Sequence, residues 1–145
     1  LIAGGLMLPR EGAALLSIAD RDKAEALTII RMLASQGYRF YATEGTGAML
    51  TALGISVTTV SKIGEGHPDI IDSIGLIREG KVQAVINTMS GDLGPLRDGF
   101  AIRRAAAEQR IPCYTSLDTA HAAVESLINE SQDYSILRHV EYLNN

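Results

Sequence analysis

The stretch FYATEGTGAML, residues 40–50, combines three local patterns that decide how the chain folds. An apolar and aromatic run enters it, the segment TEGTG at residues 43–47 is rich in turn formers, and a helix-favouring run leaves it. A strand, a glycine-rich turn and a helix in this order often bind phosphate, because backbone amides point outward at the helix N-terminus. Taken alone, the motif is just as often only a turn. The remainder of the chain has to decide between the two interpretations.

The same alternation of strand and helix continues along the whole chain. Residues 13–18 are continuously apolar, which is typical of a strand buried on both faces of a sheet. Further strands are predicted at residues 38–42, 55–60, 82–86 and 111–115. Helices are predicted from Asp20 or Asp22 to Gly37 and at residues 48–53, 69–79, 100–110 and 116–128, with a polar loop at 87–98. This alternation predicts an α/β fold of three layers, α/β/α, around a five-stranded parallel sheet.

Length and composition limit the classes of protein to consider. With 145 residues, 46% of them hydrophobic, the chain can form one domain with a proper core. A net charge of −4 without any basic run argues against binding to nucleic acid. The apolar N-terminal run is interrupted by Pro9 and is too short to span a membrane, so no membrane association is expected. The single cysteine, Cys113, cannot form an internal disulfide, which fits a reducing compartment such as the cytoplasm.

Ligands of open parallel sheets bind beyond the carboxyl ends of the strands, and here the loops carry groups suited to a phosphate monoester. Thr43 and Thr46 supply hydroxyls, and Lys62 follows the third strand. Lys23 lies in the first turn of a helix, where a cation opposes the helix dipole, and a bound anion would explain its presence. Asn87 ends the fourth strand, where an amide can bond a ribose hydroxyl or a base edge. Together they predict a phosphate-binding site at one edge of the sheet.

Each of these residues also has an ordinary structural explanation. A lone lysine after a strand is usually solvated, and an asparagine there is usually a turn former or a backbone cap. Convergence on one sheet edge is what favours the binding site. Other kinds of site have weaker support: the three histidines are scattered and Cys113 has no partner at metal-ligand spacing, so no metal site is predicted. Cys113 is instead expected to be a buried core residue.

Six runs of residues, in order across roughly residues 12–130, closely resemble one family. The runs occupy residues 17–23, 42–46, 60–66, 85–88, 98–106 and 115–117. The family is the C-terminal allosteric domain of the large subunit of carbamoyl-phosphate synthetase, which has the methylglyoxal synthase-like fold. The resemblance implies strand order 3-2-1-4-5, a linker from a preceding synthetase domain at residues 1–10 and the allosteric domain at residues 11–145. The chain is therefore expected to be a piece of a longer polypeptide.

The resemblance implies a regulatory module with no catalytic residues of its own. In the family, the effector's phosphate is bound at the positions of Lys23, Thr43, Thr46 and Lys62, and the ribose and base lie near those of Asn87, Asp98 and Ile102. Bacterial members are inhibited by UMP, and some relatives are activated by IMP, ornithine or phosphoribosyl pyrophosphate. The expected effector is therefore UMP-like, with IMP and phosphoribosyl pyrophosphate as alternatives. It would control carbamoyl phosphate synthesis for pyrimidine and arginine biosynthesis.

The resemblance also implies partners beyond this effector. They would be the remaining synthetase domains of the same large subunit and the glutaminase small subunit, and self-association into a homo-oligomer is left open. No cofactor is expected in this domain, because ATP and a divalent metal would belong to the synthetase domains that the chain lacks. The polar loop at residues 88–99 is expected to be mobile without ligand and to close over the base when a nucleotide binds.

The main alternative is a free-standing methylglyoxal synthase of the same fold, which acts on dihydroxyacetone phosphate. That enzyme needs proton-transfer groups around its phosphate pocket. Ala19 stands where it has a histidine after the first strand, Arg97 where it has another, and GHPDI at residues 66–70 replaces its Gly-Gly-Asp-Gln-Gln run. These departures favour a sensor over an enzyme. A third class, a purely structural oligomerisation domain, would not explain the cations and hydroxyls gathered at one edge.

Overall fold

A five-stranded, all-parallel sheet forms the centre of the protein, in the order β3-β2-β1-β4-β5. The computed structural model describes residues 8–60, 72–88 and 93–144, with side chains at residues 8–60, 72–88 and 100–130. The strands are β1 (Ala13–Ser17), β2 (Arg39–Ala42), β3 (Thr58–Thr59), β4 (Ala84–Asn87) and β5 (Cys113–Tyr114). The helices are η2 (Asp20–Asp22), α1 (Lys23–Ser35), α2 (Glu44–Ala52), α3 (Ser73–Arg78), α4 (Leu93–Glu108) and α5 (Leu117–Asn144). The predicted strand order is confirmed.

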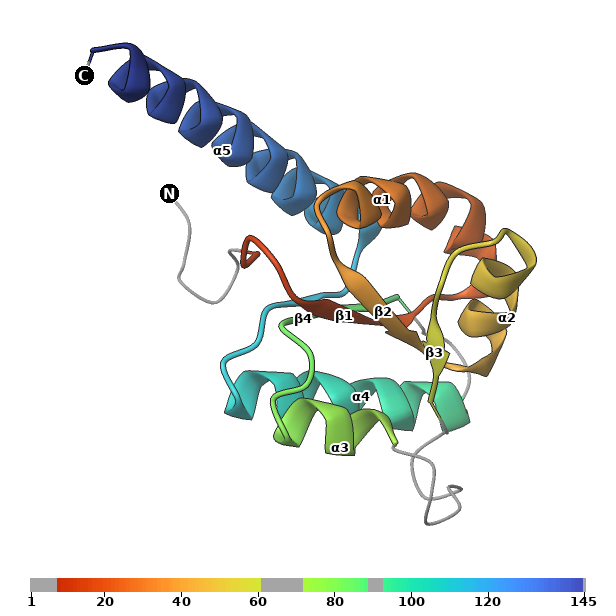
Figure 1. The fold of residues 1–145 in the computed structure, drawn as a ribbon. Helices are drawn as coiled ribbons and strands as arrows, with labels where there is room; N and C mark the ends of the chain where they lie inside the picture. The colour runs from red at the N-terminus through yellow and green to blue at the C-terminus, as the bar shows by residue number, and fades with distance from the viewer. Residues whose placement is uncertain (1–7, 61–71, 89–92, 145) are drawn as a thin grey trace.

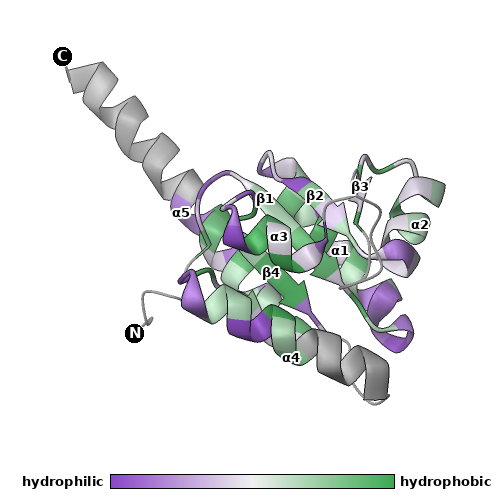
Figure 2. Ribbon diagram, turned by 90° about the horizontal axis from the view of Figure 1, so that it is seen from below, coloured by the Kyte–Doolittle hydropathy of each residue, from purple (hydrophilic) through white to green (hydrophobic). Residues whose placement is uncertain are grey.

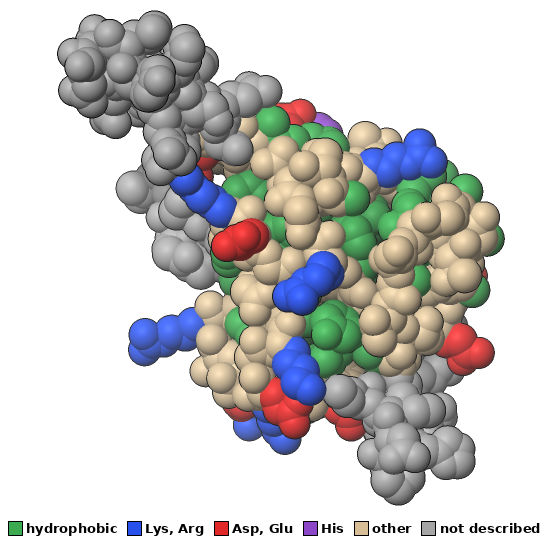
Figure 3. Space-filling model, in the orientation of Figure 1, with side chains coloured by type: hydrophobic (Ala, Val, Ile, Leu, Met, Phe, Trp, Pro, Cys, Tyr) green, Lys and Arg blue, Asp and Glu red, His purple; other side chains and the backbone are tan. Residues whose placement is uncertain are grey.

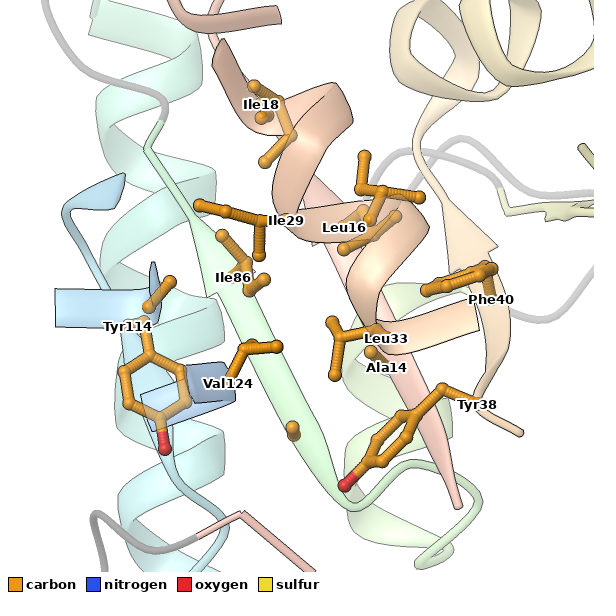
Figure 4. Close-up of a cluster of buried hydrophobic side chains, with 14 of the residues drawn as sticks. Ala14, Leu16, Ile18, Ile29, Leu33, Tyr38, Phe40, Ile86, Tyr114 and Val124 are labelled. Carbon is orange, nitrogen blue, oxygen red and sulfur yellow. The ribbon is translucent and has the colours of Figure 1, made fainter. Parts of the chain in front are cut away.

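Helices cover both faces of this sheet. Helices α1 and α5 lie on one face, α3 and α4 lie on the other, and α2 packs beside β2 and β3 (Figure 1). The first face closes over a core cluster that draws on β1, β2, α1 and α5, part of which is shown in Figure 4. The second face closes over a smaller cluster that includes residues of α3 and α4. The predicted three-layer α/β/α architecture is therefore confirmed.

Strand β1 supplies side chains to both clusters, which explains why its sequence is apolar at every position before the final Ser17. Ala14 and Leu16 belong to the first cluster, whereas Ala13 and Leu15 belong to the second. Because successive side chains of a strand point to opposite faces, a central strand between two helix layers needs apolar residues at every position. Figure 2 shows the hydrophobic residues concentrated on β1 and β4, in the middle of the sheet.

Helix α2 begins four residues earlier than predicted. Residues 43–47 were expected to form a turn before a helix at 48–53, but α2 spans Glu44–Ala52. The amide of Gly47 donates to the carbonyl of Thr43 at 2.7 Å, which is a helical i→i−4 bond. The TEGTG segment is thus the first turn of the helix itself. Its glycines weaken helix propensity, and the prediction was wrong because tertiary packing overrides that weak preference.

Other element boundaries also differ from the predictions. Residues 93–98 were expected in a loop, but α4 already begins at Leu93, because Pro95 falls within the first turn, where its missing N–H costs no helical bond. The predicted loop is therefore wrong over that part, and its closure stays a prediction for residues 89–92, which lie outside the described residues. Strand β3 is confined to Thr58–Thr59, shorter than the predicted 55–60. The last helix continues to Asn144, well beyond the predicted 128.

The end of the expected linker packs against the domain. Leu8 is buried within the first core cluster. The hydroxyl of Tyr38 donates to the carbonyl of Pro9 at 2.6 Å, next to the start of β2. Residues 8 and 9 are therefore held by the fold, while residues 1–7 lie outside the described residues. The domain boundary near residue 10 stays a prediction.

Candidate functional site

The carboxyl ends of β1, β2 and β4 meet at one edge of the sheet. Their parallel register pairs Leu16 with Ala42, and Ser17 with Asn87. The segments that leave these strands therefore start side by side. They carry the first turn of α1, the first turn of α2 and the residues that follow β4.

Lys23 lies against the N-terminus of α2, although it is the first residue of α1. A Cβ atom built on Gly45 would lie 3.2 Å from the Lys23 ammonium nitrogen, so this nitrogen sits over the first turn of α2. The Lys23 side chain is 22% exposed. Because a helix N-terminus carries a partial positive charge, a cation beside it creates a local field that favours an anion.

The carboxylate of Asp20 forms an ion pair with Lys23. Its Oδ1 lies 2.6 Å from the Lys23 nitrogen, and the Asp20 side chain is 96% exposed. The hydrogen bond from Lys23, together with its charge, holds the pKa of Asp20 below the usual range. An exposed pair of this kind contributes little to stability. A phosphate group could therefore replace Asp20 as the partner of Lys23 at small cost.

Thr43 is the N-cap residue of α2, but its side chain does not bond to the helix within the described part of the chain. Its amide donates to the carbonyl of Leu16 at 3.1 Å, which ties the start of α2 to the end of β1. The first amides of an α-helix have no acceptor inside the helix. Those of residues 44–46 therefore need partners from outside it, and the oxygens of a phosphate are suitable acceptors.

Thr46 is buried and uses its hydroxyl to hold the loop that follows β1. It is 1% exposed, and its Oγ1 accepts a hydrogen bond from the amide of Ile18 at 3.1 Å. Thr88, which directly follows β4, does the same for the next residue: its Oγ1 accepts from the amide of Ala19 at 3.0 Å. A hydroxyl that accepts an N–H still has its own O–H to donate. Contact with a phosphate thus remains chemically open to Thr46.

Gly47 is placed where a side chain would have little room. A Cβ atom at this position would lie 2.7 Å from the Oγ1 of Thr59 in β3. Any larger residue would push α2 away from the edge of the sheet unless Thr59 moved. In the sequence, this glycine suggested a phosphate-binding turn, whereas the structure relates it to the close approach of helix and strand.

The four remaining predicted site residues are either buried or not described with their side chains. Asn87 ends β4 at the same edge as Thr43, but is 1% exposed. Ile102 is 2% exposed and belongs to the second core cluster together with β1 residues. Asp98 lies in α4, at a position where only the backbone is described, and Lys62 lies outside the described residues. Lys23, Thr43 and Thr46 are thus brought together, and the contacts predicted for the other four stay predictions.

Sequence reasoning did not single out Thr88 as a site residue. The signal was available, because Thr88 directly follows the fourth predicted strand and so had to lie at the ligand-binding edge. Neither periodicity nor composition indicates that its hydroxyl accepts from the loop after β1. That contact depends on the register of β1 and β4, which the sequence alone does not specify.

The described residues present no comparable constellation elsewhere. Within the described ranges, no group of three His, Cys, Asp or Glu side chains could hold a metal ion. Lysine and arginine side chains are dispersed over the face drawn in Figure 3 and do not form one patch there. Cys113 is half-buried against the second core cluster, and burial raises the pKa of its thiol to about 11. Across the helices that the structure describes, none is both long and apolar enough for a transmembrane segment.

A parallel α/β domain with a lysine over a helix N-terminus defines a broad class of protein, and comparison with known proteins narrows that class. Residues 25–115 match the family described as "MGS-like domain", so the chain belongs to the MGS-like domain family. A carbamoyl phosphate synthase large chain from Thermomicrobium roseum is 46% identical over 136 residues, which cover 93% of this chain and 12% of that protein. The C-terminal section of the carbamoyl phosphate synthase large chain from Methanopyrus kandleri is 44% identical over 126 residues, 87% of this chain and 23% of that protein. The chain therefore spans less than a quarter of the length of these relatives.

Proposed function

We propose that this chain is the regulatory domain of a glutamine-hydrolysing carbamoyl-phosphate synthase large chain and that it binds a UMP-like nucleotide through its phosphate. The observation that carries the proposal is the Lys23 ammonium group over the first turn of α2. A full positive charge and a helix N-terminus converge on one point, and a phosphate monoester satisfies both. The match to large chains of carbamoyl phosphate synthase supports the regulatory assignment.

In this proposal the phosphate binds to Lys23, Thr43, Thr46 and Lys62, while the ribose and base extend toward Asn87, Asp98 and Ile102. The nucleotide would control carbamoyl phosphate synthesis for pyrimidine and arginine biosynthesis in the cytoplasm. The signal would pass to the synthetase domains of the same large chain and to the glutaminase small subunit. ATP and a divalent metal would bind to those synthetase domains, and this domain would carry no cofactor of its own.

The experiment that tests the proposal compares two lysine variants by calorimetry with UMP and uridine. Lys23→Met removes the charge that lies over α2. Lys81→Met is the matched control, because Lys81 pairs with Glu79 at 3.3 Å and precedes β4, at the opposite edge of the sheet. A charge-assisted bond contributes about 1.5–3 kcal/mol, so Lys23→Met should weaken UMP binding by roughly tenfold or more.

Uridine provides the second control, since it has no phosphate to lose. Its weaker binding should be nearly the same for wild type and Lys23→Met. Higher salt should weaken the binding of UMP to the wild type more than to Lys23→Met, because only the wild type retains that charge pair to be screened. Equal affinity of the two proteins for UMP would contradict the assignment of the phosphate site.

A thermal-shift panel identifies the effector. UMP, UTP, IMP, phosphoribosyl pyrophosphate and ornithine are added separately to the chain. A ligand at about 100 times its dissociation constant stabilises the folded state by about 2.7 kcal/mol. Stabilisation by ornithine alone would overturn the phosphate-based proposal, because ornithine carries no phosphate.

The isolated domain is further proposed to have no catalytic activity of its own. Ala19 stands at the position where methylglyoxal synthase has a histidine, so the proton transfer of that enzyme has no group here to perform it. Incubation with dihydroxyacetone phosphate should yield no methylglyoxal above background. Turnover that is abolished by Asp92→Asn or Asp98→Asn would favour the alternative, a free-standing methylglyoxal synthase.

A further inference from the structure

Thr88 bonds to the backbone of the segment after β1 on both sides of Ile18. Its amide donates to the carbonyl of Ser17 at 3.0 Å, and its Oγ1 accepts from the amide of Ala19 at 3.0 Å. The bond from the Thr88 amide continues the β1–β4 ladder by one residue. The bond to the Thr88 hydroxyl fixes the position of the chain where it leaves the sheet. Thr88 is 6% exposed and Ala19 is 7% exposed, so water does not readily replace either bond.

A short chain of bonds leads from Thr88 to Lys23. The carbonyl of Ala19 accepts from the amide of Asp22 at 2.9 Å, which closes the η2 turn. The carbonyl of Asp20 accepts from the amide of Lys23. The position of the Ala19 backbone, from its amide to its carbonyl, therefore sets where η2 begins, and η2 sets where the Lys23 side chain starts.

We propose that Thr88 is a positioning residue of the phosphate site, which holds Lys23 over the N-terminus of α2 through the backbone of Ala19. The proposal rests on the phosphate site proposed above. Thr46, which lies in α2, accepts a hydrogen bond from the neighbouring amide of Ile18. The loop after β1 is therefore fixed relative to both α2 and β4. Lys23 reaches α2 only while the loop keeps this position, because the first residue of α1 follows directly from η2.

Thr88 also lies between the two halves of the proposed nucleotide site. It follows Asn87, the predicted ribose or base contact, and its hydroxyl acts on the loop that leads to the phosphate contact. A ligand that contacts Asn87 would thereby act on the position of Lys23 as well. The hydroxyl thus couples the base end of the site to its phosphate end.

The test is a double-mutant cycle between Thr88 and Lys23, read out as the dissociation constants of UMP and uridine by calorimetry. Thr88→Val keeps the shape and removes the acceptor, and Thr88→Ser restores it. Thr88→Val should weaken UMP binding roughly three- to tenfold in the wild-type background, which lies within the range of coupling between residues of one network. It should have almost no effect in the Lys23→Met background. Thr88→Ser should bind UMP within roughly twofold of wild type.

A matched control sits at the other end of the same strand. Gln83→Met removes the Oε1 atom that accepts from the amide of Ala13 at 2.7 Å, a bond of the same kind remote from Lys23. It should lower stability without changing UMP affinity. If Thr88 acts by positioning Lys23, Thr88→Val should not weaken UMP binding equally in the wild type and in the Lys23→Met variant. Equal losses of UMP affinity in the two proteins would overturn the positioning role, because a general loss of structure weakens binding whether or not Lys23 is present. Loss of uridine binding equal to that of UMP would overturn it too.

The outcomes also separate this inference from the proposed function. If Lys23→Met leaves UMP binding unchanged, the proposed phosphate site fails and this inference fails with it. If Lys23→Met weakens UMP binding and Thr88→Val does not, only the positioning role fails. Should Thr88→Val not fold, Thr88→Cys replaces the hydroxyl with a weaker acceptor and carries the same cycle. Its loss of UMP affinity, smaller than that expected for Thr88→Val, should again disappear in the Lys23→Met background, and a loss that persists there contradicts the proposal.

Discussion

At both ends of β1, side-chain oxygens accept hydrogen bonds from backbone amides, but the side chains are of different chemical types. At the amino end, Oε1 of Gln83 accepts from the amide of Ala13, and Nε2 of Gln83 donates to the carbonyl of Gly80 at 3.2 Å. At the carboxyl end, two threonine hydroxyls accept from the amides of Ile18 and Ala19. The glutamine amide uses its oxygen and its nitrogen within the fold. The hydroxyls keep an O–H to donate, and Lys23 lies over the first turn of α2, the helix that carries Thr46.

This difference shows how one strand can serve stability at one end and binding at the other. The amino end satisfies its backbone groups with bonds that stay inside the domain. The carboxyl end satisfies the same kind of group with side chains that retain a donor, next to a helix N-terminus. Changes at the amino end should therefore affect stability alone, and changes at the carboxyl end should affect stability and ligand binding together.

Alkaline pH should produce the largest effect, and it acts at the amino end. Burial raises the pKa of Tyr38 and of Tyr114 to about 12 from 10.0, and Figure 4 shows both rings at the end of the cluster away from Ile18. Between these values the unfolded chain loses its protons first, so the folded state loses stability as pH rises from 10 to 12. The two tyrosines together should lower the free energy of unfolding by roughly a few kcal/mol.

Urea denaturation from pH 8 to pH 12 measures this decline. Tyr38→Phe, which also removes the bond to Pro9, should be less stable at pH 8 and should lose less on going to pH 12. Threonine hydroxyls do not ionise in this range, so the carboxyl end has no equivalent response. An unchanged slope in Tyr38→Phe would show that another group, such as Cys113 with its raised pKa of about 11, causes the decline.

Thr46→Val should come second in size. It leaves the buried amide of Ile18 without its acceptor, and this should lower the free energy of unfolding by about 1–3 kcal/mol. UMP binding should weaken as well, whereas Thr46→Ser should restore both properties. Chemical denaturation and calorimetry on the same preparations measure the two effects. Full UMP affinity in a destabilised Thr46→Val protein would remove Thr46 from the proposed phosphate site.

Gln83→Met should have a smaller effect. The bond to Ala13 is partly exposed, so the cost should be about 1 kcal/mol. UMP affinity should equal that of the wild type. A loss of UMP affinity comparable to that of Thr46→Val would contradict the view that the amino end of β1 affects stability alone.

Gly47→Ala should give the smallest effect. Alanine favours the helix by about 1 kcal/mol, but its Cβ would meet Oγ1 of Thr59, so the two terms nearly cancel. In a Thr59→Ala background, the contact is absent and Gly47→Ala should be stabilising. Thermal denaturation of the four proteins of this cycle measures the coupling. A coupling free energy near zero would show that α2 does not depend on its close approach to β3.

The sequence predicted the sheet order and the edge at which Lys23, Thr43 and Thr46 meet, because strand alternation and the rule for ligand sites in parallel sheets need only local patterns and a resemblance. It did not predict that residues 44–47 are helical. Glycine and threonine disfavour a helix locally, and contacts with β3 and with the loop after β1 reverse that preference. The role of Thr88 was missed for a related reason, since side-chain to backbone bonds across strands depend on register.

The burial of Cys113 has a practical consequence for spectroscopy. A thiol whose pKa is raised to about 11 is almost entirely protonated at pH 7, and the thiolate is the form that reacts with maleimides. Because the sequence has no other cysteine, a cysteine introduced at an exposed position such as Asp20 should react far faster than the native one. A fluorophore attached there would report on the surroundings of Lys23 in real time, with the native thiol left in place.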